Sequence, residues 1–342
     1  KKFHTLFGDN NESVTKAALS MNQGFFQPIP SSSGSIIETG GNVFALSILV
    51  PDYDFYNGEV PTKLGGISSL SYLDQSLWIG GSYALSLSEE DSVGVTFYYT
   101  ARNFSSKVNE TYFPTPTDAT IYSEEKILEN NNAVLVMGYH KFLSRNLKLG
   151  VSYRPRSWKI HGKGSFYHSS LQTNPYQFAP LNEVGIGSDA PVPQRLSLGV
   201  AYELPGFLIL SADASVYGSE NYRDLNSDIA GQMMEHRQVV NFAAGAELSI
   251  FSWLKARVGG FTNLSALPKP QDSQFTREGD HIDYLGFSSN LTYISKDKVG
   301  YTFGGYYIGG RGYSKQRTNQ QFEVITKSQQ VFTMLVATSF WF

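Results

Sequence analysis

The feature that most constrains this fold is an alternation of apolar and polar side chains with a period of two residues. It recurs in segments of about ten residues that are rich in Gly, Ser, aromatic and β-branched side chains, whereas helical periodicity is almost absent. Strands of ~9–11 residues are long enough to cross a bilayer when they are tilted. The pattern predicts twelve strands, at residues 41–51, 76–88, 93–104, 131–142, 147–159, 194–204, 207–217, 238–250, 254–263, 281–294, 298–311 and 330–342.

The links between these segments are alternately short and long. Short links at 89–92, 143–146, 205–206, 251–253 and 295–297 alternate with long ones at 52–75, 105–130, 160–193, 218–237, 264–280 and 312–329. An up-and-down barrel of the outer membrane has this asymmetry, whereas a soluble β-sandwich has no reason for it. No stretch approaches 18 consecutive apolar residues, which excludes a membrane-spanning helix. We therefore predict an all-β fold, a transmembrane antiparallel up-and-down β-barrel in the bacterial outer membrane.

The alternation alone does not tell which face of the barrel is apolar. In 194–204, for example, one face carries Leu196, Leu198, Val200 and Tyr202 and the other carries Arg195, Ser197 and Gly199. A soluble barrel would turn the apolar face inward. Three features favour a membrane. The polar face is rich in Gly, Ser and isolated charges, and Trp253 and Trp341 fall at the short-link ends, where an interfacial aromatic belt would lie. The segment 330–342 ends in the aromatic residue Phe342, which resembles the C-terminal signature of bacterial outer-membrane barrels.

Residues 1–40 fit the alternation poorly, and two interpretations are open. The segment is either a hatch or plug inside the lumen, or it supplies, together with Ile67–Leu73, a further pair of strands. We favour the second interpretation, which gives fourteen strands. The predicted organisation is thus an N-terminal segment, residues 1–40, and a barrel, residues 41–342. Because the sequence starts at Lys1 without an apolar leader, we expect a mature or trimmed product.

Composition excludes several kinds of function. The absence of cysteine excludes disulfides, zinc–thiolate sites and thiol nucleophiles, and a net charge of −3 gives no field for nucleic acid. The glycine pairs Gly304-Gly305 and Gly309-Gly310 lack a nucleotide-binding pattern, so no cofactor is expected. His281 lies between two acids, which is more typical of a solvated strand end than of a catalytic base. We expect no enzymatic activity.

Charged side chains on the polar face are the candidate ligand-binding residues of the lumen. A tight turn at 251–253 would place Glu247 opposite Arg257 and Ser249 opposite Lys255, and a tight turn at Pro205 would place Asp213 opposite Ser197. Such pairs either stiffen the wall or line a pathway for a ligand with an acidic head group. We favour the first use, although an excess of arginine over carboxylate around Lys148, Arg154 and Arg156 gives slight support to the second. The candidates are Arg154, Arg156, Arg195, Asp213, Glu247, Lys255 and Arg257.

The long links combine proline with aromatic side chains. Tyr112 and Phe113 precede Pro114, and Tyr176 and Phe178 lie between Pro175 and Pro180. Exposed aromatic rings of this kind would form a capture surface for a hydrophobic molecule or a docking surface for a protein partner. The alternative is that they pack on one another as a lid.

Several strand patterns resemble one known family. The stretches Gln194–Tyr202, Ala256–Asn263, His281–Phe287 and Tyr301–Tyr307 resemble, in the same order, the later strands of the long-chain fatty-acid transporter family of the FadL/TodX type. The resemblance implies a fourteen-stranded outer-membrane barrel with an N-terminal hatch, which takes up hydrophobic molecules through its outer loops and releases them sideways. The hatch of that family carries an Asn-Pro-Ala type motif, and residues 1–40 contain none.

Two functions follow as hypotheses. The first is an outer-membrane transporter for hydrophobic small molecules such as fatty acids, in contact with membrane lipids. The second is a non-transporting barrel that acts as a scaffold or anchor for protein partners in a secretion or surface complex.

Overall fold

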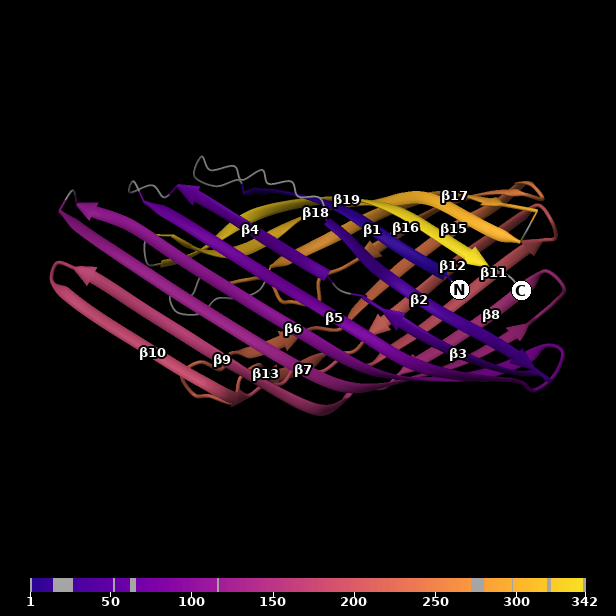
Figure 1. Cartoon of the computed structure of the whole chain (residues 1–342), viewed down its shortest axis with the longest axis horizontal. Helices are drawn as coiled ribbons and strands as arrows, with labels where there is room; N and C mark the ends of the chain where they lie inside the picture. Colours follow the sequence, from indigo (N-terminus) through magenta and orange to yellow (C-terminus); the bar gives the residue numbers. More distant parts are fainter. Residues whose placement is uncertain are drawn as a thin grey trace.

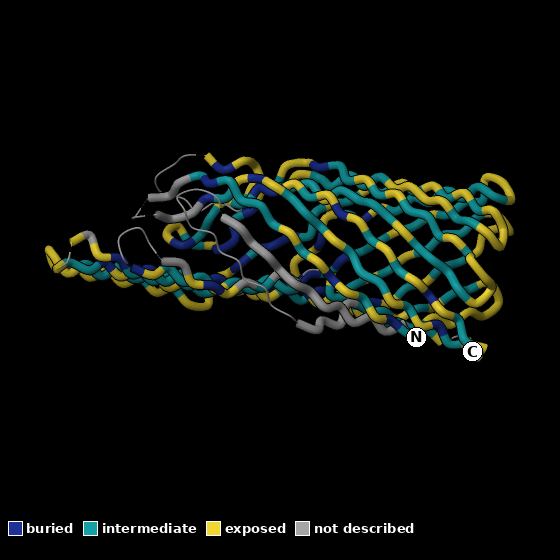
Figure 2. The backbone as a smooth tube through the Cα atoms, turned by 90° about the horizontal axis from the view of Figure 1, so that it is seen from above, coloured by how far each residue is buried: buried dark blue, intermediate teal, exposed yellow. Residues whose placement is uncertain are grey.

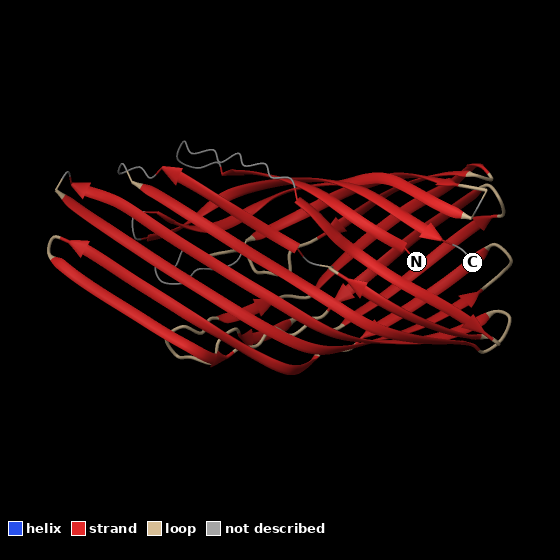
Figure 3. Cartoon of the chain, in the orientation of Figure 1, coloured by secondary structure: helices blue, strands red, loops and turns tan. Residues whose placement is uncertain are grey.

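The computed structural model describes residues 2–14, 27–51, 53–61, 66–115, 117–271, 280–296, 298–318 and 321–340. Every regular element in these ranges is a strand (Figure 3). No helix within the described ranges is long and apolar enough to cross a membrane.

Fourteen of the described strands pair in a closed antiparallel ring (Figure 1). In order around the wall they are β1 (Lys2–Val14), β2 (Gln27–Thr39), β3 (Asn42–Leu49), β5 (Ile67–Ser86), β6 (Asp91–Thr115), β7 (Asp118–Phe142), β8 (Leu147–Arg154), β11 (Arg195–Leu204), β12 (Leu208–Tyr217), β15 (Val239–Phe251), β16 (Leu254–Asn263), β17 (His281–Ile294), β18 (Val299–Thr318) and β19 (Gln321–Phe340). The ring closes where β19 pairs with β1, with Lys2 opposite Ser339. The predicted fold class, a transmembrane up-and-down barrel of fourteen strands, is confirmed.

The N-terminal segment lies in the wall in the ranges that the structure describes. Residues 2–14 form β1, between β19 and β2, and residues 27–39 form β2, which pairs with β3. These ranges therefore take the place of the extra strands and not of a plug, and residues 15–26 lie outside the described part. Ile67–Leu73 is the start of β5 and not a separate strand.

The apolar face of the wall points outward. On β11, Leu196, Leu198, Val200 and Tyr202 are each more than 40% exposed on the outer surface, while the small and polar residues between them face the lumen. The same holds for Phe287 on β17. A soluble barrel would bury these side chains, so their position confirms the prediction of a membrane-spanning barrel.

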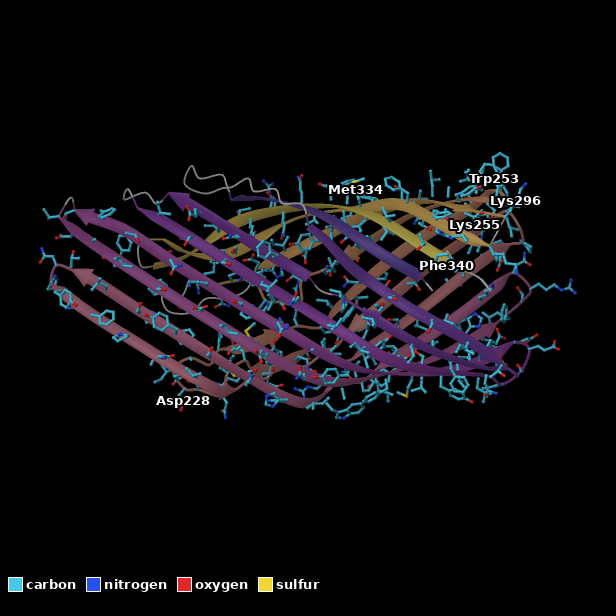
Figure 4. All side chains as sticks on the ribbon, in the orientation of Figure 1. Asp228, Trp253, Lys255, Lys296, Met334 and Phe340 are labelled. Carbon is cyan, nitrogen blue, oxygen red and sulfur yellow. The ribbon has the colours of Figure 1, made fainter. Side chains whose placement is uncertain are left out.

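Tight turns occupy one end of the barrel. Trp253 projects at this end of the barrel (Figure 4), and it stacks on Phe251. An interfacial tryptophan was predicted at this place, whereas Trp341 lies outside the described residues. One turn differs from the prediction, because Leu204 pairs with Leu208 around three residues, with Gly206 at a φ of 73°. A three-residue turn with glycine in the left-handed region is a common hairpin connection.

The long connections at the other end, here called the outer end, are mostly paired strands, which corrects the expectation of loops. Strands β5, β6 and β7 continue beyond the barrel, and three further strands join them: β4 (Tyr53–Pro61) pairs with β5, β9 (Trp158–Thr173) with β7, and β10 (Tyr176–Gly187) with β9. We call this six-stranded sheet the extension (Figure 2). Neighbouring long connections satisfy their backbone hydrogen-bonding groups by pairing with one another.

The predicted strand 147–159 is interrupted. Strand β8 ends at Arg154, and β9 starts at Trp158 along the same edge of β7. Four residues, 154–157, therefore face the three residues 134–136 of β7 without a ladder. Pro155, which has no N–H to donate, lies at this break.

Candidate functional site

The lumen is lined by small side chains in the half near the tight turns. A cavity of about 480 Å³ lies against β5, β6, β7, β8, β11 and β12. Glycines and serines of these strands face it, including Gly150, Ser152, Ser197 and Gly199. Because these side chains leave the interior unfilled, the barrel has room for a small molecule.

Two arginines face each other near the outer end of the lumen. Arg154 on β8 lies directly opposite Arg195 on β11. Their neighbours Tyr153 and Leu196 are exposed on the outer surface, so both guanidinium groups lie on the lumen side of the wall. Like charges directly opposite each other in a sheet are destabilising unless an anion compensates them.

Aromatic rings support both guanidinium groups. The Cζ of Arg154 lies 5.8 Å from the centre of the Trp78 ring, and that of Arg195 lies 5.9 Å from the centre of the Tyr217 ring. Arg154 also donates two hydrogen bonds to the Pro193 carbonyl, at 3.2 and 3.0 Å. Both guanidinium groups are therefore held in place by aromatic rings, and Arg154 is fixed further by the Pro193 carbonyl.

The Nε of Arg195 is buried and has no hydrogen-bond partner. A buried charged donor without a partner is costly, and a ligand carboxylate is the natural group to satisfy it. We call Arg154, Arg195, Trp78 and Tyr217 the arginine pair site.

Three other lumen candidates, Glu247, Lys255 and Arg257, bind one another within the protein. The predicted register of Glu247 opposite Arg257 and Ser249 opposite Lys255 is confirmed. Glu247 accepts hydrogen bonds from Arg257 at 2.6 Å and from Lys255 at 2.8 Å. Arg257 also donates to Asn290 and Thr292 on the next strand. This network ties three strands together, which fits the interpretation of charge pairs as wall stiffeners.

The structure changes the account of two further candidates. Asp213 lies opposite a different residue than predicted, and Arg156 has an ion-pair partner within the protein. Asp213 is opposite Gly199 and not opposite Ser197, because the turn after β11 is centred on Gly206 and not on Pro205. Arg156 follows the end of β8 and forms an ion pair with Glu220, with 2.8 Å between its Nε and the carboxylate.

The aromatic residues of the predicted capture surface are divided between two environments. Tyr112 near the end of β6 is buried, 4% exposed, whereas Phe113, Tyr176 and Phe178 are exposed at the far end of the extension.

The connection between β12 and β15, residues 218–237, packs against the extension, and the sequence pattern did not indicate this. It contains the short hairpin of β13 (Glu220–Arg223) and β14 (Met233–His236). Leu225 is fully buried, in a cluster with Leu128 and Ala230, against which Phe104, Phe166 and Ile186 pack. Burial raises the pKa of Tyr222 in this connection. Burial, followed by the charge of Arg102, lowers the pKa of His236.

Comparisons with known proteins add to this geometry. No protein-family model matches the chain, and no curated protein matches its sequence. Among solved structures, a FadL homologue of Pseudomonas aeruginosa is similar with a TM-score of 0.68 and 12% identity, over 98% of this chain and 89% of that one. A mutant of the monoaromatic hydrocarbon channel TodX gives a TM-score of 0.67 at 12% identity, over 100% and 89% of the two chains.

The toluene transporter TbuX of Ralstonia pickettii is similar with a TM-score of 0.58 and 12% identity, over 99% of this chain and 89% of that one. These similarities extend over nearly the whole chain and include the strands whose patterns carried the resemblance. This chain therefore has the fold of the FadL/TodX type of channel.

Proposed function

We propose that this chain is an outer-membrane channel that takes up hydrophobic small molecules with an anionic head group, such as fatty acids. The observation that carries the proposal is the arginine pair site. It presents two neighbouring guanidinium groups, one with a buried and unpartnered donor, on the lumen side of the wall. The solved relatives with this fold include hydrocarbon and toluene channels, which supports a hydrophobic cargo.

Aromatic contacts along the lumen support an amphiphilic ligand. Trp78 lies against Tyr98, and Phe261 lies against Tyr306. An apolar tail would pass these rings while the carboxylate binds the arginine pair.

The test compares ligands that differ only in the head group. Purified protein in a non-ionic detergent is titrated with dodecanoic acid and with dodecanol at a pH at which the acid is ionised. We expect the acid to bind at least tenfold more tightly, since a charge-assisted hydrogen bond contributes about 1.5–3 kcal/mol. Equal affinities would contradict a carboxylate site, and binding of neither ligand would contradict a hydrophobic cargo.

We propose further that the chain acts as a channel and not as an enzyme. Three histidines of the outer half contact aromatic rings or a backbone carbonyl. His168 packs on Tyr122, His236 packs on Tyr222, and the Nδ1 of His281 lies 2.6 Å from the Leu267 carbonyl.

A scaffold function is the second candidate, and the extension favours it. Its edge strand β10 exposes Tyr176, Phe178 and Val184, at 75%, 55% and 75%. Exposed apolar side chains on a sheet edge are typical of a surface that binds another protein. A partner that copurifies in mild detergent, and is lost when these three residues become serine, would support this function.

A further inference from the structure

The connection 218–237 crosses the outer end of the lumen. It leaves the wall after β12 and returns at β15, yet Tyr222 interacts with Arg102 on β6. Strand β6 is four positions away from β12 around the ring, through β7, β8 and β11. Arg102 is held in turn by two hydrogen bonds to Asp74 on β5, at 2.8 and 2.6 Å.

The connection is anchored by one apolar contact and several polar ones. Leu225 fills the cluster at the base of the extension, and Lys126 on β7 forms a buried ion pair with Asp224. Glu220 pairs with Arg156, and Ser227 donates a hydrogen bond to Glu183 on β10. Figure 2 shows that the buried segments lie mainly in the outer half of the molecule, which contains the extension.

The barrel wall does not depend on these contacts. Beneath the connection, β12 and β15 pair with each other up to Tyr217 opposite Val239. The connection joins the extension by one isolated bridge, between Ser188 and Leu225, with backbone hydrogen bonds of 3.1 and 2.7 Å on either side. Its removal would therefore break few backbone contacts and no wall ladder.

We propose that residues 218–237 are a lid that closes the outer end of the lumen, and that the lumen behind it is a water-filled path. The glycines and serines that line the cavity, together with Lys148 and Asp213, support such a path. The lid is held by side-chain contacts on the inner face of the extension and opens by releasing them. This inference does not rest on the identity of the transported molecule.

The test measures ion conductance in planar lipid bilayers, with no hydrophobic ligand present. In the first variant, residues 219–237 are replaced by Asn-Gly, a turn suited to a hairpin between β12 and β15. In the second, Lys126→Ala and Arg156→Ala remove the wall-side partners of Asp224 and Glu220. We expect both variants to conduct at least tenfold more than the wild type.

A matched control removes two charges from the outer face of the same extension. Lys107 and Lys163 form exposed pairs with Glu125 and Glu129, so Lys107→Ala with Lys163→Ala changes the charge equally without touching the lid. We expect wild-type conductance from this control. Folding of the turn-replacement variant is checked by its heat-modifiable mobility on a gel. If the folded variant conducted like the wild type, the proposal would be overturned.

A disulfide lock makes the test reversible. Ser188 and Leu225 form a bridge without hydrogen bonds between themselves, in which Cα atoms are about 4.5 Å apart, and the chain has no cysteine of its own. Ser188→Cys with Leu225→Cys is added to the Lys126→Ala/Arg156→Ala variant. We expect oxidation to close the pore and reduction to reopen it. Conductance that is the same in both states would also overturn the lid.

Discussion

Replacement of Arg195 by glutamine should weaken ligand binding without weakening the barrel. Arg195 is directly opposite Arg154, so removal of one positive charge relieves a repulsion of about 0.2–1 kcal/mol. The buried Nε of Arg195 has no partner in the protein, so no internal hydrogen bond is lost there. Loss of the cation–π contact with Tyr217 offsets this gain, so the free energy of unfolding should change by less than about 1 kcal/mol.

The affinity for an anionic ligand should fall in the same variant. A hydrogen bond between a guanidinium and a carboxylate contributes about 1.5–3 kcal/mol, which corresponds to a loss of about 10- to 100-fold in affinity. Isothermal titration with dodecanoic acid measures this loss, and urea unfolding in detergent or lipid measures the stability. Dodecanol should bind the variant and the wild type equally.

The control variant is Arg311→Gln, which removes the same charge outside the lumen, because Arg311 is exposed on the outer surface of β18. The affinity of this variant for dodecanoic acid should equal that of the wild type. If Arg195→Gln lost stability but kept its affinity for the acid, Arg195 would be a structural residue and the arginine pair site would be wrong.

Three further predictions concern the lumen and the lid. Gly304→Ala should lower the free energy of unfolding by about 1–3 kcal/mol, because its Cβ would lie 2.3 Å from the Asn290 Cβ and 2.4 Å from the Ser289 carbonyl, whereas Gly150→Ala, with open space around it, should be neutral in the same urea titration. Arg257→Met should cost about 1–3 kcal/mol, since Glu247, Asn290 and Thr292 each lose a hydrogen bond; a change below 0.5 kcal/mol would contradict the role of this network. Below pH ~6.5 the amide hydrogens of the lid should exchange faster, after correction for intrinsic rates. The pKa of His236 is lowered while the lid is packed, so on acidification the imidazole binds a proton more readily when the lid is displaced, and protonation favours the displaced lid. The effect should vanish in His236→Gln.

The sequence by itself determined the local features of this barrel. Strand positions followed from the period-two alternation, and the pairing of Glu247 with Arg257 followed from a tight turn, since a short link fixes the register of the strands that it joins. The same logic placed Asp213 wrongly, because turns centred on Pro205 and on Gly206 look alike in the sequence and differ in register. The candidate site was predicted in part: Arg154 and Arg195 were singled out as lumen arginines, but their mutual contact was not.

Only the tertiary structure decided the features that depend on distant partners. The alternation within one strand does not tell which of its two faces points into the lumen. That choice is made only when the strands close into a ring, whose curvature turns one face outward toward the lipid. Closure itself joins Lys2 to Ser339, residues at opposite ends of the chain. Long connections look like loops in the sequence, and they become strands here because their neighbours in space satisfy their backbone groups. Leu225 is one of several apolar residues in a largely polar link, and only the tertiary structure selects it for full burial, because Leu128 and Phe166 of the extension pack around it.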